Sequence, residues 1–235
     1  MVSLVALLCT GLGSPVLHEE GRPSVAIAQA APGTLDPKPH PLPAILQTWS
    51  PTQTSEDYFD QISQLSVGYL VWGDRPVSVY VAPSQFQDAQ RSQLWQQGVN
   101  EAIGEWQKYF PLQQTQTPNA DIVIEQVKPN RTSQGRVRSG QAIPAAYCDG
   151  DRLAHRFQVQ ISPTQASQYI RAATRHELGH ALGIWGHSPN PEDVLYAAQV
   201  RQPPPISDRD INTLKRIYQQ PTLLGWPAPG YCPNS

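Results

Sequence analysis

The sequence predicts an α/β (α+β) domain built on a mixed, twisted sheet that carries two long helices. Valines alternate with polar residues over Val77–Val81, as they do in a half-buried strand. Apolar residues then recur at helical spacing over Asp88–Phe110, and a second long helix is expected over Tyr169–Gly183. At 235 residues the chain is long enough for one such domain with a full hydrophobic core, plus tails.

The first thirty residues (1–30) read as an export signal. Val2–Gly13 is an apolar run of the length of a signal core and too short to span a bilayer, and Ala28–Ala30 gives a small-x-small cleavage pattern. We therefore expect a secreted, periplasmic or extracellular protein. No Lys or Arg precedes the apolar run. A misassigned start, or a buried N-terminal segment, therefore stays open.

Residues 31–68 are rich in proline and poor in apolar side chains, which is typical of an extended linker or a pro-segment. A weak helix is expected at Glu56–Leu65. His18 and His40 fall in the leader and the linker, where we expect both to be solvated.

The globular domain is expected over residues 69–220, followed by a tail at 221–235. Its first strand is Val77–Val81, and its first long helix ends at Pro111. The core face of that helix is predicted to carry Leu94, Val99, Ile103, Trp106 and Phe110.

Two further strands are predicted in the middle of the domain. They are Ala120–Val127 and Ala154–Ser162, the second with Phe157, Val159 and Ile161 on one face. The helix over Tyr169–Gly183 follows, then an irregular stretch. The last helix begins at Ser207, a good N-cap, with Asp210 placed for a capping box.

Charge and cysteine content narrow the class of protein. The net charge of −2 gives no reason to expect a nucleic acid or an anionic membrane as partner. If Cys9 leaves with the signal, Cys148 and Cys232 remain, and a pair in an oxidising compartment readily forms a disulfide. Two unpaired thiols are the alternative.

The stretch from Thr174 to Tyr196 carries the chemistry. His176 and His180 are four residues apart on a predicted helix, so both project from one face and can meet one zinc ion. Glu177 can act as general base on a water that the zinc activates. Gly183 suits the end of the helix, after which His187 returns toward the metal. A chance match on an ordinary amphipathic helix is the competing interpretation.

The neighbouring positions support the first interpretation. Gly179 and Ala181 are small, so we expect that face of the helix to pack closely against the sheet.

"HELGHALGIWGHS" is similar to the zinc-binding signature of the metzincin peptidases, and of the matrixin (matrix-metalloproteinase-type) family in particular. The resemblance extends over roughly Leu70 to Tyr218. It implies a metzincin-like domain, with a sheet and two helices above a cleft and a small C-terminal subdomain with a third helix below. It also implies endopeptidase activity, with His176, His180 and His187 as zinc ligands and Glu177 as the base.

The zinc motif departs from the family pattern HExxHxxGxxH by one residue. The pattern places the last ligand at Gly186, whereas the histidine here is His187. The extra residue falls after the helix, where a loop can absorb it. Competing third ligands are Glu192, Asp193 and Asp208, and a carboxylate ligand would place the protein among other zinc hydrolases.

A second departure lies in the turn beneath the site. Leu195 stands where the family has methionine, and leucine is close to methionine in volume. The next residue, Tyr196, either lines the pocket for the substrate side chain after the scissile bond or braces the turn.

A weaker metal site is conceivable at Asp149, Asp151 and His155, as structural Ca²⁺ or a second zinc. A solvated loop is favoured there, because the ligand set is small.

The sequence as a whole predicts a monomeric zinc-dependent endopeptidase acting on a protein or peptide substrate. The alternatives are a zinc hydrolase of another class, such as a cell-wall amidase, and a peptide-binding zinc module with little or no catalysis.

Overall fold

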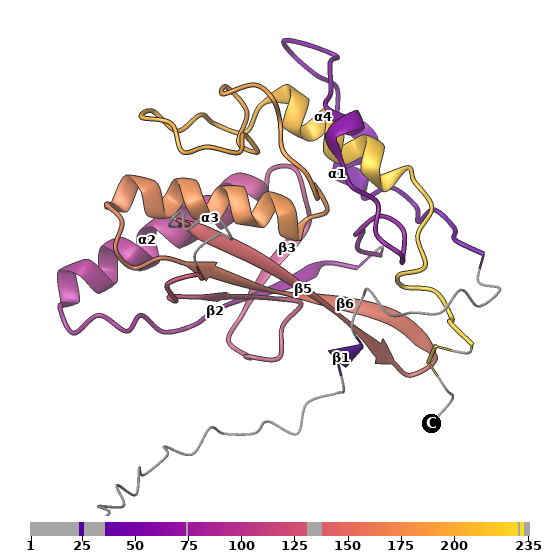
Figure 1. Cartoon of the computed structure of the whole chain (residues 1–235), viewed down its shortest axis with the longest axis horizontal. Helices are drawn as coiled ribbons and strands as arrows, with labels where there is room; N and C mark the ends of the chain where they lie inside the picture. The colour runs from indigo at the N-terminus through magenta and orange to yellow at the C-terminus, as the bar shows by residue number, and fades with distance from the viewer. Residues whose placement is uncertain (1–23, 26–35, 74, 131–137, 230, 233–235) are drawn as a thin grey trace, which may run out of the picture.

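The computed structural model describes residues 24–25, 36–73, 75–130, 138–229 and 231–232 (Figure 1). Except for the two-residue strand β1 (Ser24–Val25), the expected export signal at 1–30 lies outside the described residues, and so does His18. Within the described part, no helix is long and apolar enough to cross a membrane.

The sheet is mixed, as predicted, and its strand order is β1-β5-β6-β4-β2-β3. β2 pairs in parallel with β3 and β4, β4 pairs in parallel with β6, and β5 is antiparallel to both β6 and β1. The strands after β1 are β2 (Val77–Val81), β3 (Leu112–Thr115), β4 (Ile122–Glu125), β5 (Gly140–Asp149) and β6 (Arg152–Ile161).

Two long helices cover one face of this sheet, which confirms the predicted architecture. α2 (Ala89–Trp106) and α3 (Ser167–Ala181) lie side by side there (Figure 1). α4 (Asp208–Tyr218) packs with the short helix α1 (Ala44–Thr48) beyond one end of α3. The sequence did not predict α1.

The core face of α2 differs from the prediction at one position. Val99, Ile103, Trp106 and the following Phe110 are fully buried, but Leu94 is 41% exposed. Trp95 takes the inner position instead, because it lies four and eight residues before Val99 and Ile103 on the same helical face. The expectation for Leu94 was wrong.

A long hairpin, β5–β6, occupies the segment before α3. In β6, Phe157, Val159 and Ile161 are buried, as expected. β5 was not predicted, since its inward positions are mostly small residues and its sequence contains Pro144. β3 was not predicted either.

Residues 36–68 lie against the C-terminal part of the chain. Lys38 pairs with Thr222, and the backbone N–H of Tyr58 donates to Thr213 Oγ1 of α4 at 3.0 Å. Instead of a helix over Glu56–Leu65, this segment contains a three-residue 3-10 turn, η2 (Phe59–Gln61).

His40 is not a solvated residue. Its ring stacks on Trp226 with centroids 4.5 Å apart, and its Nε2 lies 2.7 Å from the carbonyl oxygen of Leu224. The expectation that His40 is solvated was therefore wrong, because residues 36–40 run alongside the C-terminal segment that follows α4.

A disulfide joins Cys148 to Cys232 across 84 positions of sequence. It ties the last described residues of the chain to the far end of β5, at the tip of the β5–β6 hairpin.

Candidate metal centre

The last two turns of α3 carry His176 and His180, and the helix ends immediately after them. Gly183 has φ of +122°, a conformation that favours glycine, and a Cβ at this position would collide with the carbonyl oxygen of Leu70. The helix therefore stops where the sequence predicts, and the chain turns back toward its own last turn.

Three histidines meet at this turn. The ring nitrogens of His176, His180 and His187 that could bind a metal all lie within 4.8 Å of one another. The ring centroids are 4.8 Å apart for His176 and His180, 5.4 Å for His176 and His187, and 4.9 Å for His180 and His187. The extra residue before His187 therefore does not keep it from the other two.

Two of the three rings are oriented by backbone carbonyls. His176 Nδ1 donates to the carbonyl oxygen of Val194 at 2.7 Å, and His180 Nδ1 donates to that of Ile184 at 2.8 Å. Each of these hydrogen bonds places the ring proton on Nδ1, so that Nε2 presents its lone pair.

Burial keeps these two imidazoles in the form that binds metal. It lowers the pKa of His176 to about 4 and the pKa of His180 well below its ordinary value. Both rings are therefore neutral at physiological pH. Three neutral imidazoles that converge with a free nitrogen each are a donor set that fits zinc.

Two of the three competing carboxylates, Asp193 and Asp208, are engaged elsewhere, and Glu192 is exposed and belongs to no metal-holding group of the described residues. Asp193 is buried and accepts hydrogen bonds from Arg209, Ser207 and Ser188. Asp208 accepts from backbone amides of residues 52–54. Within the described residues, the three histidines form the only cluster of three or more His, Cys, Asp or Glu side chains able to hold a metal.

The weaker site expected at Asp149, Asp151 and His155 does not come together. Asp149 and Asp151 are exposed at the hairpin turn, whereas His155 is buried and stacks on Trp72 with centroids 3.8 Å apart. These side chains form no metal-holding group in the described part of the chain.

Glu177 lies against the first residues of β5. A Cβ on Gly140 would stand 2.6 Å from Glu177 Cγ and 2.9 Å from Oε1, so glycine is what lets the carboxyl group fit. Burial raises the pKa of Glu177 to about 8, against a hydrogen bond from the backbone of Ala142 and the charge of Arg138. The carboxyl group can therefore hold a proton near neutral pH.

Sequence reasoning missed the three residues around Glu177. Arg138, Gly140 and Ala142 fall in or beside a segment that reads as a loop. The one available signal was the glycine, since a glycine in a strand often marks a close approach by another group.

The turn beneath the site is closed by Leu195, which is fully buried. A Cβ on Gly179 would stand 2.6 Å from a Cδ of Leu195 and 3.1 Å from Trp106 of α2. The expectation that Gly179 packs against the sheet was therefore wrong. Tyr196, at the end of this turn, is half-buried, and its N–H donates to the carbonyl of Asp193 at 3.2 Å.

A buried carboxylate on α4 supports the same turn. Asp210 Oδ2 accepts the backbone N–H of Val194 at 3.1 Å and that of Ser207 at 2.8 Å, completing the predicted capping box. Its Oδ1 accepts the hydroxyl of Tyr58 at 2.6 Å.

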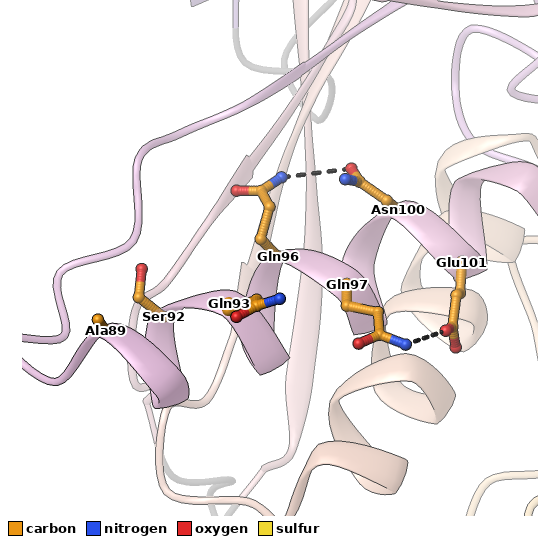
Figure 2. A pocket seen from close by; sticks show the side chains of 7 residues that line it. All are labelled: Ala89, Ser92, Gln93, Gln96, Gln97, Asn100 and Glu101. Carbon is orange, nitrogen blue, oxygen red and sulfur yellow. Dashed lines mark hydrogen bonds between the residues drawn. The ribbon is translucent and has the colours of Figure 1, made fainter.

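The described residues also form surface hollows. A pocket of about 310 Å³ lies beside His187, lined by Ser55, Glu56, Asp57, Tyr58, Ser188, Pro189 and Arg209. The larger one, about 760 Å³, lies on α2 and is lined by residues of that helix alone (Figure 2). Its amides pair along the helix, Gln96 with Asn100 and Gln97 with Glu101, and it contributes nothing to the histidine cluster.

Comparison with known proteins identifies the family. The matrixin family model matches residues 71–219, which is more than half of the 235-residue chain and includes all three histidines. A search of curated proteins gives no match. On its family match, its mixed sheet and its histidine cluster, the chain belongs to the matrixin family of zinc metallopeptidases.

Proposed function

We propose that this chain is a zinc-dependent endopeptidase in which His176, His180 and His187 bind the metal and Glu177 acts as general base. The strongest support is the geometry of α3. Two neutral imidazoles with free Nε2 atoms stand one turn apart, and a buried carboxyl group lies between them in sequence. Zinc bound there supplies a Lewis acid that makes water a stronger nucleophile and polarises a carbonyl group.

Glu177 moves the proton in this proposal. It takes a proton from the attacking water and returns it to the leaving amine. Burial makes the ionised form of this carboxyl a stronger base, and the backbone hydrogen bond from Ala142 keeps it oriented.

The β5 edge offers a place for an extended peptide. Among the described residues, β1 pairs only with Ala146 and Tyr147 of this strand. The edge from Gly140 to Ala145, which begins beside Glu177, can therefore accept a substrate strand through main-chain hydrogen bonds. We assign Tyr196 to the wall of the pocket for the residue after the scissile bond.

We further propose that the protein is exported and acts outside the cytoplasm as a monomer. Residues 1–30 are the export signal, residues 69–220 are the catalytic domain and 221–235 are its tail. The Cys148–Cys232 disulfide suits an oxidising compartment.

Replacing Glu177 tests the mechanism. Glu177→Ala should retain one bound zinc per chain, measured by atomic absorption, while hydrolysis of denatured protein falls about 100-fold or more. Hydrolysis that survives this change would remove Glu177 as the base.

The same preparations separate the alternative functions. Release of peptides from denatured protein supports an endopeptidase, and release of peptides from peptidoglycan alone supports a cell-wall amidase. A wild-type chain that binds zinc and peptides but hydrolyses neither substrate would be a binding module.

A further inference from the structure

His187 differs from the other two histidines in how its ring is held. His176 and His180 each donate Nδ1–H to a backbone carbonyl. Among the described residues, the exposed ring of His187 takes part in no hydrogen bond and only faces the other two rings. Its position must therefore be set by the chain on either side of it.

The residues before His187 are held by the N-terminal part of the chain. Gly186 forms an antiparallel bridge with Ile62, and Ser63 N–H donates to the carbonyl oxygen of Trp185 at 2.9 Å. A Cβ on Gly186 would collide with the carbonyl oxygen of Gln61. Since φ of Gly186 is not positive, it is this close approach that calls for glycine.

The residue after His187 is held by the rest of the site. Ser188 N–H donates to the carbonyl of Leu195 at 2.9 Å, and its hydroxyl donates to Asp193. Asp193 in turn pairs with Arg209 of α4 at 2.9 Å. His187 is therefore fixed through both of its neighbours.

We call residues 49–63 the N-terminal strap, because they run from α4 to the His187 loop. At the α4 end, Tyr58 binds Asp210 and Thr213, and Asp57 pairs with Arg216 at 3.0 Å. At the other end, Ile62 and Ser63 pair with Gly186 and Trp185 as described above. The strap is thus held by α4 at one end and by the loop before His187 at the other.

We infer that the N-terminal strap is a positioning element for the zinc centre, which holds His187 in reach of the metal through its pairing with Trp185 and Gly186. The extra residue of the zinc motif lies in this very loop. Within the loop, the N–H groups of Trp185 and Gly186 donate to the carbonyl oxygens of Gly183 and Ile184, and pairing with the strap adds contacts from outside the loop. This inference rests on the proposed zinc-binding function, and it adds the strap, which precedes residues 69–220, to the parts of the chain on which the zinc centre depends.

Two pairs of variants test it without altering a ligand. Gly186→Ala pushes the strap away, and its control is Gly104→Ala, where a Cβ meets nothing within 4 Å. Ser63→Pro removes the N–H that binds Trp185, and its control, Ser63→Ala, keeps it. Ile62 has φ of −92° and ψ of 125°, a conformation that a following proline tolerates.

The measurement is zinc affinity by competition with a chelator, together with the absorption spectrum of the Co²⁺-substituted protein. Gly186→Ala and Ser63→Pro should each weaken zinc binding about tenfold or more and change the Co²⁺ spectrum. Their controls should match the wild type. In a His187→Ala background, the additional loss caused by Gly186→Ala should disappear.

Each outcome decides a different claim. Wild-type affinity in both strap variants would overturn the positioning role, and so would a loss of equal size in the His187→Ala background. If Gly186→Ala does not fold, Ser63→Pro decides alone, with circular dichroism as the check on folding. A wild-type chain that binds no zinc would instead refute the proposed function.

Discussion

His176 donates its Nδ1–H to the carbonyl oxygen of Val194 at 2.7 Å, across 18 positions of sequence. The N–H of the same residue, Val194, binds the buried carboxylate of Asp210. One peptide segment therefore connects an imidazole of the histidine cluster to the N-terminus of α4, and Tyr58 supports that carboxylate from the N-terminal strap.

Tyr58→Phe tests the support of Asp210. The change removes a buried hydrogen bond to a carboxylate, so we expect the free energy of unfolding to fall by about 1–3 kcal/mol. Urea unfolding of the zinc-free protein measures this. Tyr80→Phe, on β2, is the matched control and should leave the midpoint unchanged. Equal stability of the two variants would contradict the role of the Tyr58 hydroxyl.

Gly140→Ala tests whether the position of the Glu177 carboxyl group, the proposed general base, matters for catalysis. The new Cβ would press on Glu177 Cγ, which displaces the carboxyl group without touching a histidine. We expect kcat to fall about 100-fold, because a displacement of this kind spoils alignment with the reacting atoms. Zinc affinity should stay at the wild-type value. An unchanged kcat would mean that Glu177 does not need this position.

The buried imidazole of His155 should make the free energy of unfolding fall in acid. Burial lowers its pKa to about 3, so on acidification the unfolded chain, with the ordinary value near 6.5, binds the proton first. The stabilisation is complete above about pH 6.5 and is lost as the pH falls toward 3, at up to about 1.4 kcal/mol per pH unit. His155→Phe keeps a ring against Trp72 and should flatten this slope, measured by urea unfolding of the zinc-free protein at pH 7 and pH 4.5. Parallel curves for the two proteins would exclude His155 as the cause.

The Cys148–Cys232 disulfide should contribute about 2–4 kcal/mol, because it closes a loop of 84 residues in the unfolded chain. The double variant Cys148→Ser/Cys232→Ser measures this by thermal unfolding, and reduction of the wild type should reproduce the same loss. The histidine cluster lies at the other end of β5, so zinc binding should persist in the double variant. A loss of zinc binding would show that the tail acts on the centre.

Much of the fold could be predicted because apolar periodicity specifies it. β2, α2, β4, β6 and α3 each bury a regular set of side chains, and α4 begins with a capping box that is visible in the sequence. The convergence of His176 and His180 follows from helix geometry alone.

The parts of the fold that were not predicted depend on contacts between distant residues rather than on a regular spacing of apolar residues in the sequence. β5 presents mainly small inward residues and a proline, so its alternation carries little signal. The strap places single buried residues, such as Tyr58 and Ile62, among polar ones, and its structure comes from partners far along the chain. Leu94 was misplaced because Trp95, one position on, offers the larger apolar group for the same helical face.

The hydrogen bond from Tyr58 to Thr213 spans 155 positions of sequence. The strap also pairs with Gly186, so it contacts two parts of the chain that lie far beyond it. A fragment that ends before α4 would keep all three histidines but would leave the α4 end of the strap without its partners Thr213 and Arg216. The proposed centre therefore depends on a continuous chain from the strap through α4.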